Sequence, residues 1–164
     1  MAYRIDEPRI GMQPIADTST TAQHPLGTIV RATDPTFGQG EFIYLEGCAS
    51  TAIGSWVTYD SDAGGTTLLV ANAKGMVGIA MSANVDTQYG WYQIAGVANG
   101  IGSTVSIADN ADLYATATGG TIGSTVVTGD RVWNAESRET SSDGTVKVDI
   151  GRPFVNDAVN AGTS

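Results

Sequence analysis

The chain has 164 residues, which is enough for one domain with a buried core. Glycine occurs 21 times and charged residues make up only 15% of the chain, a composition that favours tight turns and short strands over long helices. The formal net charge of −9 argues against nucleic acid as a direct partner and against attraction to anionic membranes. No run approaches the roughly 20 apolar residues of a membrane-spanning helix, so neither nucleic acid nor a membrane is expected as a partner.

Residues 1–25 are predicted to form an extended N-terminal arm. Their apolar side chains occur singly, and they are separated by prolines and followed by a polar run. Ordering such a segment costs roughly 1–2 kcal/mol per residue in backbone entropy, which isolated apolar contacts are not expected to offset. The arm is therefore expected to be loose in solution or bound to a partner. The start of the chain has no continuous apolar stretch, so no secretory signal is expected and folding inside a cell follows.

From Gly27 onward, short β-type runs separated by turn residues predict a single turn-rich, β-sandwich or barrel-like domain over residues 26–155. In the clearest run, Val146, Val148 and Ile150 share one face. No window has a sustained 3.6-residue apolar period, so any helix is expected to be a short connector near 71–74. Residues 156–164 are predicted to form a flexible C-terminal tail. In chain order, strands are expected at 28–32, 41–46, 55–59, 66–70, 76–81, 89–95, 105–107, 111–116, 131–135 and 145–150.

Few residues are candidates for catalysis. The one histidine, His24, lies in the polar stretch of the arm and is interpreted as a surface residue, because a flexible arm does not hold a base rigidly. The one cysteine, Cys48, is interpreted as a small buried hydrophobe, and one His with one Cys does not complete a zinc site. The glycine-rich segment 96–102 lacks the Gly-Lys-Ser/Thr ending of a phosphate-binding loop and is predicted to be a turn.

The acidic residues leave two alternatives open. Asp60 with Asp62, and Asp109 with Asp112, place carboxylates close together, but neither pair has the downstream Glu of an EF-hand calcium loop. They are interpreted as solvated turn carboxylates. A carboxylate pair for glycoside chemistry is permitted by 17 acidic residues, yet no spacing singles one out. The sequence therefore predicts no enzymatic activity, no cofactor and no metal.

Two adjacent aromatic residues, Trp91 and Tyr92, point to opposite faces of their predicted strand. At least one of them therefore faces away from a single core layer, and exposed aromatic surface usually marks an interface. The alternative is that both faces of the strand are covered within one chain. Trp56 and Trp133 occur singly in strands and are predicted to lie in the core.

Four stretches resemble the capsid cement (head decoration) proteins of tailed phages in their order and spacing. They are YGWYQIAG (89–96), ADLYATATGG (111–120), GDRV (129–132) and VDIGRPFV (148–155), within a likeness that spans about residues 75–157 and is weaker from Gly27 onward. These motifs are strand and turn signatures, which are less specific than a catalytic motif. The arm matches only in general character.

The resemblance implies a β-rich body that assembles as a homotrimer on a phage head with the HK97-type shell fold, where it binds the major capsid protein. The arm is then expected to lie along capsid subunits, on the outer surface of a virion assembled from proteins made in the host cytoplasm. The implied subunit-interface residues are Trp91 and Tyr92. The implied capsid-contact residues of the arm are Tyr3, Arg4, Ile5, Arg9, Ile10 and Met12.

A second function fits the same sequence. A receptor- or glycan-binding module of a phage tail fibre or adhesin is also β-rich, acidic and oligomeric. In that case Trp91 and Tyr92 are expected to be stacking platforms for sugars. A hydrolase with a carboxylate pair is the third alternative.

Overall fold

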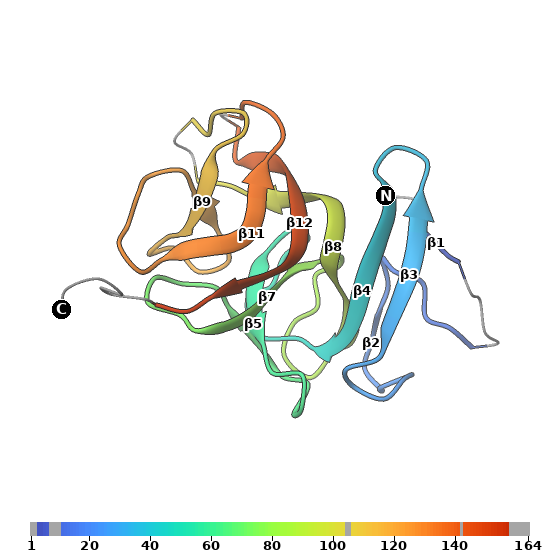
Figure 1. Cartoon of the computed structure of the whole chain (residues 1–164). Helices are drawn as coiled ribbons and strands as arrows, with labels where there is room; N and C mark the ends of the chain where they lie inside the picture. Colours follow the sequence, from blue (N-terminus) through green and yellow to red (C-terminus); the bar gives the residue numbers. More distant parts are fainter. Residues whose placement is uncertain (1–2, 7–10, 104–105, 142, 158–164) are drawn as a thin grey trace.

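The computed structural model describes residues 3–6, 11–103, 106–141 and 143–157, and these residues form an all-β, sandwich-like domain, which confirms the predicted fold class. None of the described residues is helical, and no helix that could cross a membrane is found among them. The strands (Figure 1) are β1 (Arg4–Ile5), β2 (Thr18–Ser19), β3 (Ile29–Asp34), β4 (Gly38–Glu46), β5 (Trp56–Tyr59), β6 (Thr66–Leu68), β7 (Gly75–Ala80), β8 (Tyr89–Ile101), β9 (Asp112–Ala115), β10 (Ile122–Gly123), β11 (Arg131–Ser137) and β12 (Thr145–Val155).

The strands join into one antiparallel sheet in the order β1-β3-β4-β8-β7-β12-β11-β9-β10, with β2 paired to β8 and β5 paired to both β6 and β7. Two long strands change partners along their length. The first half of β8 pairs with β4 and β7, and its second half pairs with β12. The last residues of β12 then pair with β7. Because β7, β8 and β12 each pair with the other two, the sheet folds back on itself (Figure 1).

β8 is longer than predicted because most of the glycine-rich segment 96–102 continues the strand instead of turning. Gly96 has a φ of +97°, and a Cβ at this position would lie 2.6 Å from the carbonyl oxygen of Gln39. Glycine therefore lets the two backbones approach closely where β8 leaves β4 and continues beside β12. The predicted turn is wrong, because glycines also occur where two strands approach each other more closely than a side chain would allow.

The other predicted strands correspond to β3–β7, β9, β11 and β12, with ends shifted by a few residues. In the predicted strand at 105–107, Val105 lies outside the described residues and Ile107 forms only an isolated bridge with Ser141. The connector at 71–74 is a turn and not a helix. Of the predicted C-terminal tail, residues 158–164 lie outside the described residues.

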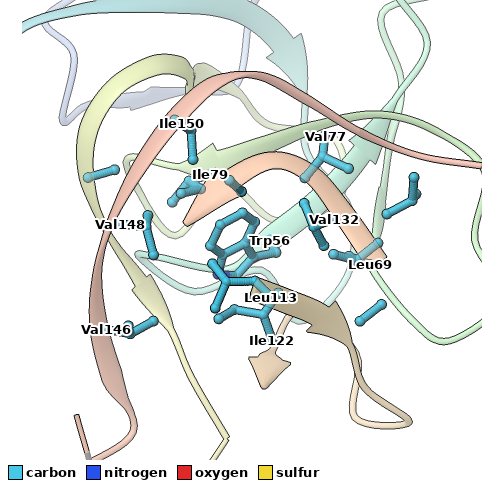
Figure 2. Close-up of a cluster of buried hydrophobic side chains, with 14 of the residues drawn as sticks. Trp56, Leu69, Val77, Ile79, Leu113, Ile122, Val132, Val146, Val148 and Ile150 are labelled. Carbon is cyan, nitrogen blue, oxygen red and sulfur yellow. The ribbon is translucent and has the colours of Figure 1, made fainter. Parts of the chain in front are cut away.

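The largest hydrophobic cluster surrounds Trp56, which is fully buried as predicted. Figure 2 shows its indole enclosed by aliphatic side chains from several strands that meet at the centre of the body. The inward face of β12 contributes Val146, Val148 and Ile150, so the alternation predicted for this strand is confirmed. The cluster around Trp56 thus joins β5, β7, β11 and β12, the strands that carry the candidate surface.

The sheet formed by β4 and the first half of β8 is covered on both of its faces, which explains four consecutive buried residues in β4. One face packs against the N-terminal segment, and the other packs against β5 and β6. The first face presents Phe42, Tyr44 and Trp91. The second face presents Ile43, Leu45 and Tyr92.

The described part of the predicted arm packs against its own chain. β1 pairs with β3, and β2 pairs with the start of β8. Ile15 is only 3% exposed, and Tyr3, Ile5 and Met12 are half-buried against the aromatic face of β4 and β8. The expectation of an arm that is loose or bound to a partner does not describe these residues, which pack on their own sheet. Burial against its large aromatic side chains offsets the entropy cost of ordering the segment.

Candidate interaction surface

The structure buries both members of the aromatic pair that the sequence placed at a subunit interface. Trp91 and Tyr92 are 0% exposed, since the strand that holds them is covered on both faces. Trp91 Nε1 donates to the carbonyl oxygen of Gln13 at 2.9 Å, and Asn84 Nδ2 donates to the Tyr92 hydroxyl at 3.0 Å. The expectation that one of the pair is exposed is wrong, and neither is placed to bind a second subunit or stack on a sugar.

The residues predicted to contact a capsid fall into three groups. Tyr3, Ile5 and Met12 are half-buried against the chain's own sheet, and the Tyr3 hydroxyl donates to the carbonyl oxygen of Val97 at 3.1 Å. Arg4 is exposed on β1. Arg9 and Ile10 lie outside the described residues. The predicted anchors are therefore occupied within the chain, because the aromatic face of the sheet is their nearest apolar surface.

A different set of large side chains does reach the surface. Tyr59, Met76, Phe154 and Trp133 lie directly opposite one another on four adjacent strands, β5, β7, β12 and β11. Directly paired residues of an antiparallel sheet point to the same face, so the four side chains form a continuous row, which we call the aromatic stripe. At about 4.8 Å per strand, the row is about 14 Å long.

The aromatic stripe is exposed at its centre and at one end. Met76 is 37% exposed and Trp133 is 39% exposed, whereas Tyr59 and Phe154 are half-buried. Tyr59 packs against the cluster that contains Tyr92, so the stripe is the outer margin of a packed core. Burial raises the pKa of the Tyr59 hydroxyl, and the nearby Arg152 opposes this rise. The Tyr59 end of the stripe is therefore packed against the core, whereas Met76 and Trp133 expose apolar surface to solvent.

Trp133 has defined neighbours at its exposed position. The guanidinium carbon of Arg131 lies over the indole, 4.4 Å from the ring centroid, and the Phe154 ring is stacked with a centroid distance of 6.5 Å. Arg131 also pairs with Asp112, with 2.6 Å between its Nη2 and the carboxylate oxygen. These contacts support the indole from two neighbours, and one of its faces is covered by the guanidinium.

The backbone beside the stripe adopts an uncommon geometry. Trp133 pairs with Phe154, but Ala135 pairs with Ile150, so four residues of β12 span the distance of two on β11. Asn134 has a φ of +59° and Arg152 a φ of +50°, a region that costs non-glycine residues of order 1 kcal/mol each. The bulge turns the Arg152 side chain toward β4, where its Nη2 lies 3.2 Å from Glu41.

The acidic pairs considered as cation sites have ordinary structural roles. Asp60 accepts hydrogen bonds from the backbone N–H groups of Asp62 and Ala63, which is typical of a turn. Asp112 is paired with Arg131, and Asp109 is exposed. Among the described residues, no group of three or more His, Cys, Asp or Glu side chains is arranged to hold a metal ion.

Sequence reasoning missed the aromatic stripe, although a signal for it was present. Strict alternation places Val132 inside β11 and Trp133 outside it, so the prediction that Trp133 lies in the core conflicts with its neighbour. Met76 likewise precedes the inward-facing Val77. Cys48 is half-buried rather than buried, and it packs against the Tyr92 cluster.

No protein-family model matches the chain, and comparisons with curated proteins and with solved structures found no match either.

Proposed function

We propose that this protein is a non-enzymatic structural component of a tailed-phage head. In this proposal it binds the outside of an HK97-type shell as a homotrimeric decoration protein, and its direct partner is the major capsid protein. The observation that carries the proposal is the aromatic stripe, because aromatic residues, Met and Arg are enriched where one protein binds another. The resemblance of the β8, β9 and β12 sequences to cement proteins supports the same function.

The geometry of the stripe favours a protein surface over a sugar as its ligand. A sugar ring stacks on an open aromatic face, but Arg131 already lies over the Trp133 ring. Trp91 and Tyr92, the alternative platforms, are fully buried. An apolar row about 14 Å long, flanked by Arg131 and Arg152, instead fits a flat partner surface with apolar groups and carboxylates.

Stabilisation of a shell follows from mass action. A protein that binds the assembled shell and not its free subunits favours the assembled state by about 2.7 kcal/mol per site when its free concentration is a hundred times Kd. Trimerisation adds avidity, since the second and third contacts form at a high effective concentration. In this proposal the exposed Arg4 on β1 adds an ion pair with a capsid carboxylate.

The abundance of the protein in particles tests the proposal directly. Quantitative mass spectrometry of purified particles should find this chain in numbers similar to those of the major shell protein. A few copies per particle would instead support a tail-fibre module, and absence from particles would refute both.

A matched pair of substitutions tests the stripe. Met76 and Val85 are both 37% exposed, but Met76 lies in β7 and belongs to the stripe, whereas Val85 lies in the loop between β7 and β8. Met76→Glu should weaken binding to purified undecorated heads by at least about tenfold, or about 1.4 kcal/mol, because an unpaired carboxylate would be desolvated at the contact. Val85→Glu adds the same charge and should leave Kd unchanged within about twofold.

Co-sedimentation with undecorated heads measures both affinities, and thermal unfolding shows whether each variant is folded. Equal loss of binding in the two variants would mean that charge alone weakens the interaction. Full binding by a folded Met76→Glu variant would show that the stripe is not the contact.

A further inference from the structure

The N-terminal strap, which we define as residues 11–25, is fastened to the sheet through one buried glutamine. Gln13 is only 6% exposed, and each of its polar groups has a partner. Its side-chain oxygen accepts from the Tyr44 hydroxyl at 2.8 Å, and its carbonyl oxygen accepts from Trp91 Nε1 at 2.9 Å. Its side-chain amide donates to the carbonyl oxygens of Asp17 and Tyr89. Gln13 is therefore the residue at which most side-chain bonds from the strap to the sheet meet, while the pairing of β2 with β8 and the bond from the Gln23 N–H to the Tyr44 hydroxyl add further contacts to the sheet.

The backbone N–H of Gln13 donates to His24 Nε2 at 3.0 Å. Nε2 accepts this bond only when it carries no proton, so the closed strap requires a neutral imidazole. A protonated ring would place an N–H donor against the backbone N–H donor of Gln13, which then loses its acceptor. His24, which the sequence assigned to the surface, is half-buried and joins the network of Gln13.

The surroundings of His24 do not offset that conflict. Its ring centroid lies 4.9 Å from Tyr44 and 5.5 Å from Trp91, and a contact between an imidazolium and these rings would not restore the acceptor that the Gln13 N–H loses. Burial lowers the pKa of His24 from its ordinary value of 6.5. The titratable and charged side chains on the described elements packed around the ring are Tyr44 and Glu41 on β4, Tyr89 on β8, Arg31 on β3 and Asp6 after β1.

Those neighbouring charges are engaged elsewhere. Arg31 pairs with Glu41 at 3.5 Å, and the Asp6 carboxylate accepts hydrogen bonds from Thr33 and Gln39. A hollow opens beside the histidine, lined by apolar side chains such as Met12 and Ile29 and by polar ones that include Asp6, Arg31 and Glu41. The imidazolium therefore has space to leave the network, whereas none of these carboxylates is placed to hold it there.

We propose that protonation of His24 releases the N-terminal strap from the sheet, which makes the strap a pH-dependent cover over the aromatic face of β4 and β8. Release uncovers Tyr44 and Trp91 and frees Met12 to contact another surface, while β1 stays paired with β3. This inference goes beyond the proposed head-binding function, and it holds or fails for the isolated chain at any partner concentration.

The direction of the pH effect follows from linkage. A group whose pKa is lower in the closed state contributes its full stabilisation above its ordinary pKa of 6.5, and this stabilisation falls as the pH drops through the closed-state pKa. Below pH 6.5 the ratio of closed to open strap should fall by up to about tenfold per pH unit. Below the closed-state pKa it should become constant again.

Nuclear magnetic resonance of the whole chain tests the proposal, because His24 is the single histidine and its imidazole signal is unambiguous. Hydrogen exchange of the strap amides at Gln13 and Gln23, which donate to His24 Nε2 and to the Tyr44 hydroxyl, reports strap opening when it is divided by the intrinsic rate at each pH. The Val148 amide in β12 serves as the reference for the body. His24→Gln is the matched variant, since its side-chain oxygen still accepts a hydrogen bond but does not titrate.

In the wild type, His24 should titrate below pH 6.5, and strap protection should fall from pH 6.5 down to the pH at which His24 titrates, while Val148 stays protected. In His24→Gln, strap protection should be independent of pH within about twofold. The proposal is overturned if His24 titrates without a change at Gln13, or if both proteins lose strap protection together. The wild-type measurement decides the matter even if the variant folds poorly, and head binding at neutral pH tests the proposed function separately.

Discussion

Replacing Gly100 with alanine should disrupt the core around Trp56. A Cβ at Gly100 would lie 2.4 Å from Trp56 Nε1 and 2.8 Å from Cε2, whereas non-bonded contacts are optimal at about 3.5–4.0 Å. Trp56 is 0% exposed and enclosed by aliphatic side chains (Figure 2), so the indole has no free space into which to move. The close approach of β8 to this ring therefore depends on the missing side chain.

The expected cost follows from two opposing effects. Overpacking a well-packed core destabilises the folded state by about 1–3 kcal/mol. In the opposite direction, alanine lowers the conformational entropy of the unfolded chain, which stabilises the protein by about 0.4–1 kcal/mol. The free energy of unfolding should therefore fall by about 1.3 kcal/mol, which for a chain of this size lowers Tm by about 3–5 °C.

Gly151 provides the control within the strand that pairs with β8. It pairs with Ala95, has no positive φ, and has nothing within 4 Å of its Cβ position. Gly151→Ala should therefore keep or raise stability by about 0.4–1 kcal/mol. Urea denaturation followed by circular dichroism measures both variants. The packing argument is refuted if Gly100→Ala unfolds within about 0.5 kcal/mol of the wild type, or if the two variants lose equal stability.

Two further predictions concern the polar groups of the core. Gln13→Ala should lower the free energy of unfolding by about 1–3 kcal/mol, since the Tyr44 hydroxyl and the Tyr89 carbonyl lose a buried partner. Urea denaturation measures this change, and an unchanged midpoint would show that the strap adds no stability. Burial raises the pKa of Tyr92 and of Tyr3 to about 12, so the stability from their neutral phenols is complete below pH 10.0 and is lost as the pH rises to about 12. An alkaline absorbance titration should show these phenolates forming late, and full ionisation of all six tyrosines near pH 10.0 would contradict this.

Local sequence pattern was sufficient for the fold class and for most strands. Val146, Val148 and Ile150 alternate with polar residues, and this alternation alone places them on one face. Trp133 could have been placed at the surface by the same rule, because Val132 precedes it and points inward. The candidate surface was therefore partly readable, but its extent was not, since the aromatic stripe joins residues 59, 76, 133 and 154 across four strands.

By itself the sequence determined an all-β chain with many turns, because side-chain alternation and turn chemistry act over a few neighbouring residues. Only the tertiary structure decided what covers each strand. Trp91 and Tyr92 are both buried because the strap, more than 60 residues earlier, covers one face and β5 and β6 cover the other. Gly96 continues a strand because the Gln39 backbone lies against it. Whether a side chain is buried depends on which segments, far apart in the sequence, pack against it, and the local pattern of residues does not contain that information.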